Sequence, residues 1–434
     1  MGKESKGPAK LETCRTLSLF CNREPWAMER RFPCGSFASG PMNRFWFFAL
    51  FGALIAFRAS TPGAIAEIPR GWKEAARYSA EHNGFAFLIL KSGRVVFEDY
   101  SRADRDCPYR IYSGTKGFWA LAAVAAVQDG ILSLDERVSD SVPEWRRDPI
   151  KKQVTVRQLL NFTSGLEPGF FLHGSGFEDR DRIALHLPMV ARPGSAFLYG
   201  PSSLQVFHHL LEVKLARYGE TPKQYLERRV LRPLGLGPQR YLEDGKGNPL
   251  LATGFVMTAR QWARLGNALV RGGRPIVEPR FLQACFEGSR ANGAFGIGFW
   301  TNRQASLRHA REVSIEGMLH HKWWQQDWTR ACICKDAPVD LVAAVGSGSQ
   351  RMYVIPSQGL VIVRQGWDRS FSDAHFLRLF FSGTEFQTSA KKAQHLVPAS
   401  QESLTKASRK KHAIVAAREV GVTARERGGR LDSP

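Results

Sequence analysis

Residues 111–145 read IYSGTKGFWALAAVAAVQDGILSLDERVSDSVPEW and carry the strongest helix signal in the chain. Residues 113–129 are almost continuously apolar, and Gly130 follows them, a residue type that commonly ends helices. The pattern predicts a helix over 113–129 that begins at Ser113. Taken alone, Ser113 could be an ordinary N-cap, because serine is a favoured residue at that position.

Strand and helix signals on either side of this segment indicate the fold class. Residues 85–90 and 95–100 alternate with a short polar connection and predict a β-hairpin, and residues 340–365 predict strand, turn and strand. Apolar periodicity predicts further helices at residues 155–163, 202–217 and 258–270. Strands gather at both ends of this region and helices fill its middle. We therefore expect an α/β protein of the α+β type, with one sheet built from both chain ends and a helical region inserted between them.

The composition is that of a globular protein, with 434 residues, 43% hydrophobic and 23% charged. The net charge of +21 invites a nucleic-acid or membrane interpretation. The distribution of charge weakens this interpretation. Residues 1–66 and 385–434 each have a net charge of +5, which leaves +11 for residues 67–384. We expect a small-molecule substrate and no nucleic-acid partner. A basic interaction protein that acts through its tails remains a possible reading.

The N-terminal region contains the pattern of a secretory signal. The residues MNR at 42–44 precede thirteen apolar residues at 45–57, and AIA at 64–66 fits a cleavage site. A thirteen-residue helix is about 20 Å long, which is short of a bilayer core of ~30 Å, so we expect no stable membrane span. We interpret residues 1–41 as an over-called extension, 42–66 as a signal peptide, 67–384 as a globular domain, and 385–434 as a basic disordered tail. The protein is then exported, to the periplasm or beyond, with an N-terminal membrane anchor as the alternative.

The tetrapeptide Ser113-Gly-Thr-Lys116 places a hydroxyl and an amine one helical turn apart. A serine hydroxyl is a weak nucleophile that needs a nearby base, and a lysine at a helix N-terminus has its pKa lowered towards that task. The same spacing recurs in the basic tail at Ser389/Lys392, Ser403/Lys406 and Ser408/Lys411, but there no apolar helix can fix the geometry. Phosphate-loop, zinc-protease and GxSxG motifs do not occur, so we expect neither a metal nor a cofactor.

Residues 111–145, followed by TVRQLLNFTSGL, resemble the serine β-lactamase-like hydrolase family. That family includes class C β-lactamases, DD-peptidases, several carboxylesterases and 6-aminohexanoate-dimer hydrolases. Further similar segments follow in the family's order: RPGSAFLYGPSSLQVFHHLLE, LERRVLRPLGLG, ATGFVMTARQWARLGNALVRGG, FGIGFW and GSGSQRMYVIPSQGLVIVRQG. The resemblance covers roughly residues 72–383. It implies the β-lactamase/transpeptidase-like fold, a mainly antiparallel sheet flanked by helices with a helical subdomain.

The resemblance also implies roles for individual residues. Ser113 matches the acylated nucleophile and Lys116 its helix partner. Tyr199 stands where the family has the tyrosine of a Tyr-x-Asn motif, and a phenolate near a cationic lysine could take the serine proton. Whether Tyr199 or Lys116 is the principal base stays open, since the two would titrate as a pair. Pro201 replaces the asparagine of that motif and removes a side-chain amide.

The family's third motif, Lys-Thr-Gly or His-x-Gly, corresponds here to a cation-free turn with Gly346, Ser347 and Gly348. We expect a main-chain amide near Gly348 to hold the oxyanion together with the amide of Ser113, with the register open by one or two residues. Trp323 and Trp324 are expected to line the pocket and favour a neutral or apolar acyl group.

The sequence therefore predicts an acyl-enzyme serine hydrolase that acts on a small ester or a short linear amide. Without a cation in the third motif, a substrate carboxylate lacks its usual partner, which disfavours β-lactams and peptidoglycan stems. The alternatives are a DD-peptidase or β-lactamase, and a penicillin-recognising sensor domain without turnover.

Overall fold

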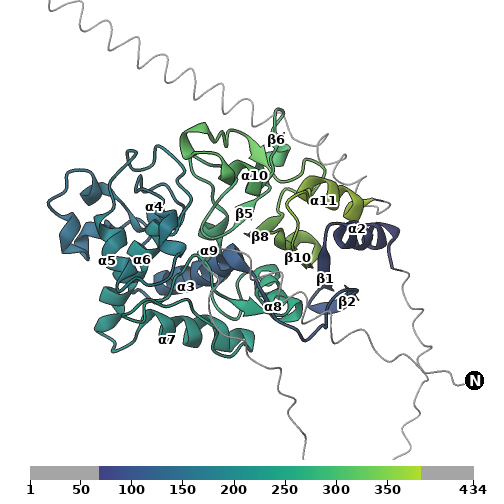
Figure 1. Ribbon diagram of the computed structural model, residues 1–434, viewed down its shortest axis with the longest axis horizontal. Coiled ribbons are helices and arrows are strands. Elements are labelled where there is room, and N and C mark those ends of the chain that lie inside the picture. The colour runs from purple at the N-terminus through teal and green to yellow at the C-terminus, as the bar shows by residue number, and fades with distance from the viewer. Residues whose placement is uncertain (1–67, 383–434) are drawn as a thin grey trace, which may run out of the picture. The chain divides into compact units, whose positions relative to one another are not determined.

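The computed structural model describes residues 68–382 of the chain (Figure 1). The expected N-terminal extension, signal peptide and basic tail lie outside the described residues, so those assignments remain predictions. Within residues 68–382, every helix is too short or too polar to cross a bilayer.

A six-stranded antiparallel sheet in the order β2-β1-β10-β9-β8-β5 organises the fold (Figure 1). Strand β1 pairs with β2 on one side and with β10 on the other, so the two ends of the described chain meet inside one sheet. The strands are β1 (Gly84–Lys91), β2 (Arg94–Asp99), β5 (Trp300–Thr301), β8 (Val342–Gly346), β9 (Gln350–Ile355) and β10 (Leu360–Gly366). The sheet built from both ends, predicted from the pattern of strands, is confirmed.

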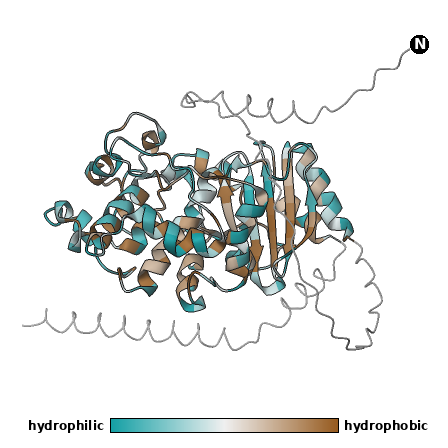
Figure 2. Ribbon diagram, turned by 90° about the horizontal axis from the view of Figure 1, so that it is seen from below, coloured by the Kyte–Doolittle hydropathy of each residue, from teal (hydrophilic) through white to brown (hydrophobic). Residues whose placement is uncertain are grey.

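Helices cover both faces of this sheet. Side chains alternate between faces along a strand, so the neighbours Met352 and Tyr353 of β9 point to opposite sides. Tyr353 stacks on Phe376 of α11 (Asp373–Phe381), which packs against α2 (Arg70–Glu81). Met352 lies against Gly266 of α8 (Ala259–Val270) on the other face. Figure 2 shows hydrophobic residues concentrated along the strands between these two layers.

A helical region, inserted in sequence between β2 and β8, packs around α3 (Lys116–Gln128) (Figure 1). Eleven of the thirteen residues of α3 are buried, as its continuous apolar sequence requires. The surrounding helices are α4 (Val156–Leu160), α5 (Arg180–His186), α6 (Ser202–Ala216), α7 (Pro222–Leu226) and α9 (Pro279–Leu282). Two short strand pairs, β3 (Tyr109–Arg110) with β4 (Val256–Met257) and β6 (Arg311–Glu312) with β7 (Ala331–Cys332), and the helix α10 (Ile315–His320) complete the elements used below.

The central helix begins later than expected. Residues Tyr112–Thr115 form a 3-10 turn, η1, and α3 starts at Lys116. Tyr112 has a φ of 45°, in the left-handed region, so a right-handed helix cannot extend back through it. The ordinary N-cap interpretation of Ser113 is therefore wrong, because the N-cap residue of α3 is Thr115.

Candidate active site

Ser113 and Lys116 lie next to each other where η1 passes into α3. The Lys116 Nζ atom is 2.8 Å from the Ser113 Oγ atom. The preceding residue, Tyr112, has a left-handed backbone conformation. Such strained conformations of non-glycine residues are concentrated at functional sites. A Cβ atom on Gly114 would come within 2.5 Å of the Trp262 ring, so the turn packs tightly against α8. The serine and the amine are thus held by rigid surroundings.

Lys116 is a buried amine that forms no ion pair with an acidic side chain of residues 68–382. Its residue is 4% exposed, and besides Ser113 its Nζ atom donates to the main-chain carbonyl of Ala252 at 2.8 Å. Burial lowers the pKa of Lys116 from 10.5 to about 7, because a charged amine loses its hydration there. A substantial fraction of the amine is then neutral near pH 7, with a lone pair able to accept a proton. Desolvation is the cause of the lowered pKa, whereas the sequence argument relied on the field of the helix N-terminus.

Tyr199 completes the group. Its hydroxyl is hydrogen-bonded to Ser113, and the Lys116 Nζ atom lies 4.6 Å from the centre of its ring. Burial raises the pKa of Tyr199 well above 10, more than its hydrogen bond to Ser113 lowers it. The side chain therefore keeps its proton, which argues against the phenolate base considered from the sequence. The structure brings Ser113, Lys116 and Tyr199 together as expected, although they come from two segments more than 80 residues apart.

Gly200 and Pro201, which follow Tyr199 in the motif, are both tightly surrounded, and Pro201 stands where the family has asparagine. A Cβ atom on Gly200 would lie 2.3 Å from the Pro168 carbonyl oxygen, so only glycine fits beside the tyrosine. Pro201 is buried and precedes the first turn of α6. The second polar contact of the Lys116 amine is supplied by the Ala252 carbonyl. Ala252 could not be predicted from the sequence, because every residue type has a main-chain carbonyl that can accept a hydrogen bond.

The turn between β8 and β9 lies beside the nucleophile segment. A Cβ atom on Gly346 would come within 2.1 Å of the Ile111 carbonyl oxygen, so the end of β8 passes directly against the chain that leads to Ser113. Gly348 has a φ of +72°, and the Trp367 ring covers the position that a Cβ atom would occupy. Trp367 in turn contacts Tyr112, with ring centres 5.7 Å apart. The cation-free third motif is therefore next to Ser113.

The hydrogen bonds of the amides in this turn narrow the expected register. The Gly348 N–H donates to the Glu316 Oε1 atom at 2.8 Å, so it is already engaged and does not fit the role of the second oxyanion donor. Ser347 is exposed, and within residues 68–382 its amide makes no hydrogen bond with a turn carbonyl or a side chain. The Ser347 amide, from the same motif, is thus the better candidate.

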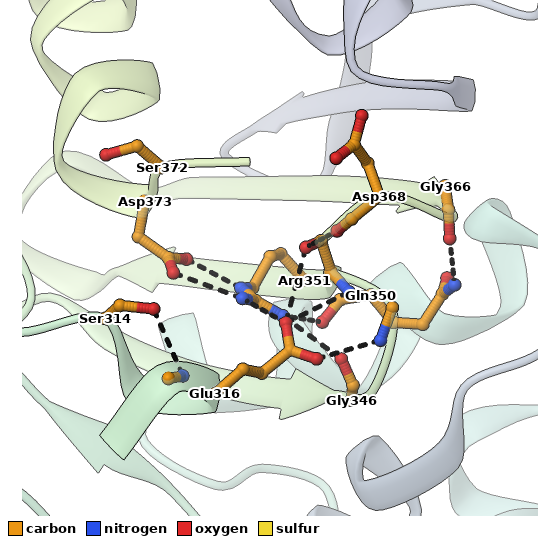
Figure 3. A network of polar contacts seen from close by, with 12 residues as sticks. Ser314, Glu316, Gly346, Gln350, Arg351, Gly366, Asp368, Ser372 and Asp373 are labelled. Carbon is orange, nitrogen blue, oxygen red and sulfur yellow. Dashed lines mark hydrogen bonds and ion pairs between the residues drawn. The ribbon is translucent and has the colours of Figure 1, made fainter. Parts of the chain in front are cut away.

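Glu316 and two buried partners hold the turn from behind (Figure 3). Arg351 is 1% exposed, pairs with Asp373 at 2.6 Å and with Glu316 at 2.8 Å, and donates to the Gly346 carbonyl at 3.1 Å. Glu316 comes from α10, about 200 residues after Ser113, and nothing in its local sequence marks it as part of the site.

The two predicted pocket tryptophans have a different environment. Trp324 is 61% exposed, and its ring contacts are with Trp323 and with the Lys322 amine. Within the described residues, neither tryptophan makes a ring or polar contact with Ser113, so their role as pocket walls stays a prediction. The aromatic rings beside Tyr199 are those of Phe162, Phe197, Phe295 and Trp300.

His173 is a further residue near the amine that the sequence argument missed. It ends the 3-10 turn η5 (Phe170–His173), and its pKa is lowered to about 4 by burial and by the charges of Lys116 and Arg180. The imidazole is therefore neutral near pH 7 and adds no positive charge beside Lys116.

Comparison with known proteins agrees with this fold. The family described as Beta-lactamase matches residues 72–365. Protein Rv1367c from Mycobacterium tuberculosis is 24% identical over 261 residues, which cover 53% of this chain and 60% of that protein. Protein flp from Staphylococcus aureus strain MW2 is 26% identical over 168 residues, covering 35% of this chain and 33% of that protein. The matched region is thus less than two thirds of the length of these relatives.

Solved structures share the fold at low sequence identity. The esterase EstCE1, described as a hydrolase with promiscuous acyltransferase activity, superimposes with a TM-score of 0.53 at 18% identity, over 74% of this chain and 97% of EstCE1. A penicillin-binding protein homologue from Caulobacter crescentus gives 0.52 at 17% identity, over 74% and 98% of the two chains. A D-stereospecific amidohydrolase from Streptomyces sp. gives 0.51 at 16% identity, over 73% and 100%.

An antiparallel sheet with flanking helices and a serine bonded to a buried lysine defines the β-lactamase/transpeptidase-like class of fold and site. Since the family match extends over well more than half of the sequence, the chain belongs to the beta-lactamase family of serine hydrolases.

Proposed function

We propose that this protein hydrolyses a small ester or a short linear amide through an acyl-enzyme on Ser113. The observation that carries the proposal is the 2.8 Å contact between the Ser113 Oγ atom and a Lys116 amine that burial makes partly neutral. An amine in that state can remove the hydroxyl proton as the oxygen attacks.

In the first half of the reaction, the Ser113 oxygen bonds to the substrate carbonyl carbon while its proton moves to the Lys116 amine. The amides of Ser113 and Ser347 would stabilise the oxyanion that develops. The bond to the leaving group then breaks, Tyr199 donates its hydroxyl proton to the departing oxygen or nitrogen, and Tyr199 takes in exchange the proton that Lys116 removed from Ser113. Water repeats the sequence on the acyl-enzyme and releases the acid.

Two observations support the substrate class. The turn after β8 has no lysine or histidine to meet a substrate carboxylate, and the nearby Arg351 is buried behind Glu316. Among the proteins of similar fold, one is described as a hydrolase with acyltransferase activity and another as an amidohydrolase. Neutral esters and amides are therefore better candidates than β-lactams or peptidoglycan stems.

A fluorophosphonate probe with intact-mass readout tests the nucleophile. The wild type should gain one phosphonyl group and hydrolyse 4-nitrophenyl butyrate, whereas Ser113→Ala should do neither and Lys116→Ala should do both slowly. Ser403→Ala, which removes a serine of the same four-residue spacing from the tail, is the matched control and should behave as the wild type. Labelling that persists in Ser113→Ala would remove the assignment.

A fluorescent penicillin distinguishes the proposed esterase or amidase from a penicillin-recognising protein. Brief or absent labelling is expected of an esterase or amidase. Stable labelling of Ser113 without ester turnover would instead identify a penicillin-recognising domain, for which the replacement of asparagine by Pro201 provides the physical reason.

We further propose that the protein is exported, on the basis of the signal-like segment at 42–66. N-terminal sequencing of the mature protein should begin near Glu67. An intact Met1 would exclude this processing.

A further inference from the structure

Glu316 makes an unusual set of contacts at the turn beside the nucleophile. Its carboxylate accepts hydrogen bonds from the Gly348 amide at 2.8 Å and from the Ser349 amide at 3.1 Å. It also pairs with Arg351 at 2.8 Å, whereas the Ser349 hydroxyl, 3.3 Å from the carboxylate, has its shorter contact, 2.6 Å, with the Asp368 carbonyl. One side chain from α10 thus receives three donors, two of them main-chain amides of the two residues that follow Ser347.

The far side of the turn is fixed as well. Arg351 donates to the Gly346 and Gln350 carbonyls, both at 3.1 Å, and the buried Arg364 donates to the Ser349 carbonyl at 2.6 Å. Ser347 is the exposed residue in the middle of this braced turn, between residues whose main-chain groups are all held. Its amide direction therefore depends on Glu316 and Arg351 together.

Glu316 is also the outermost charge of this cluster. Its side chain is 24% exposed, compared with 1% for Arg351 and 4% for Asp373, and Arg364 is fully buried. Its charge reaches Tyr199, since it is one of the groups that raise the pKa of that phenol. Where relatives are expected to present a cation, the charge nearest the surface of this cluster is a partly exposed carboxylate that is ion-paired with Arg351.

We propose that Glu316 is a positioning and specificity-determining residue: it fixes the turn so that the Ser347 amide faces the Ser113 oxygen, and its charge makes the site select neutral acyl groups over carboxylate-bearing ones. The inference rests on the proposed acyl-enzyme function. Glu316 acts through the turn and through its field, and it takes no proton from the substrate.

A pair of esters tests the selectivity on the unmodified protein. We expect kcat/KM for 4-nitrophenyl butyrate to exceed that for the mono-4-nitrophenyl ester of glutaric acid, with the difference shrinking as salt screens the charges. Equal or faster hydrolysis of the glutarate ester would overturn the specificity assignment. It would point instead to Arg110 and Arg240, which line a small cavity beside Tyr112.

Glu316→Gln tests the positioning. The NH₂ group of the new side chain is a donor and would face the donors of the Ser349 amide or of Arg351. These hydrogen bonds would be lost, so the turn should shift. We expect kcat per active site, counted by fluorophosphonate titration, to fall by about 10- to 100-fold with little change in KM. The preference for the neutral ester should fall by about fivefold. Glu316→Asp, which keeps the charge, should retain the ester preference and recover part of kcat.

Glu312→Gln is the matched control, because Glu312 lies on β6, pairs with Arg378 and is 23% exposed. It should leave both kcat and the ester preference unchanged. A Glu316→Gln protein with wild-type kcat per site and ester preference would overturn the proposal while Ser113→Ala still abolished hydrolysis. Hydrolysis that survived Ser113→Ala would instead overturn the proposed function itself. If Glu316→Gln fails to fold, as a melting curve would show, Glu316→Asp and the wild-type ester ratio still decide the outcome.

Discussion

The buried amine of Lys116 should make both activity and stability depend on pH in the same window. Its pKa is about 7 in the fold and 10.5 ordinarily, because burial penalises the charged form. Below pH 7 the amine is protonated in the folded and the unfolded chain alike. Between pH 7 and 10.5 the unfolded chain binds a proton that the folded chain does not, so the free energy of unfolding rises with pH. At about 1.4 kcal/mol for each tenfold change in proton affinity, the whole effect is roughly 5 kcal/mol.

Two assays measure this effect independently. The kcat/KM for a neutral ester should rise about tenfold per pH unit below pH 7 and level off above it, because the neutral amine is the reactive form. In urea unfolding, Lys116→Met should be more stable than the wild type at pH 7. That advantage should shrink by roughly 2 to 3 kcal/mol by pH 9 as the wild-type lysine escapes the cost of burying its charge.

Lys151→Met is the matched control for the kinetic assay. Lys151 is also buried and donates to a main-chain carbonyl, that of Leu185, at 2.8 Å. Because it lies outside the Ser113 group, its replacement should leave the pH profile of kcat/KM unchanged. A wild-type profile that is flat between pH 6 and 8, or a Lys116→Met stability difference that does not vary with pH, would refute the neutral-amine mechanism.

Three further variants probe the rest of the site. Tyr199→Phe should lower kcat for esters by about 100-fold, because it removes the proton donor, and an unchanged kcat would exclude that role. Arg351→Met leaves the Asp373 carboxylate buried without its cation and should lower the free energy of unfolding by about 3–5 kcal/mol in urea titrations; a loss below about 1 kcal/mol would contradict the bracing role. Gly348→Ala puts a Cβ atom 2.3 Å from the Trp367 ring at a φ of +72°. It should destabilise the fold by about 1–3 kcal/mol in thermal melts, and a neutral result would show that the turn relaxes freely.

The pairing of the sheet illustrates what pattern could predict. Residues 85–90 and 95–100 form strands joined by a two-residue loop, Ser92 and Gly93, both with positive φ, as the favoured hairpin turn requires. The helix predicted at 258–270 is α8, with Thr258 as a capping residue. In each case the signal is short-ranged, so the residues that decide the element are neighbours in the chain.

The central helix shows where local reasoning stops. Its apolar run was visible, but its first turn was not, because the left-handed backbone of Tyr112 depends on packing against residues far away in sequence. The pocket role expected of Trp323 and Trp324 stays a prediction for a similar reason. The same two residue types can form an exposed aromatic pair or the wall of a pocket, and only the folded structure distinguishes the two.

By itself, the sequence determined that a serine and a lysine stand three residues apart next to a buried apolar helix, because residue types and spacing can be seen in the chain. Through the order of the family's segments it also predicted that Tyr199 and the glycine turn belong to the same site. The tertiary structure alone decided which proton each group holds, because desolvation depends on every neighbour of Lys116 and Tyr199. It likewise decided that Glu316 occupies the Gly348 amide, a contact between segments that only folding brings within hydrogen-bond distance.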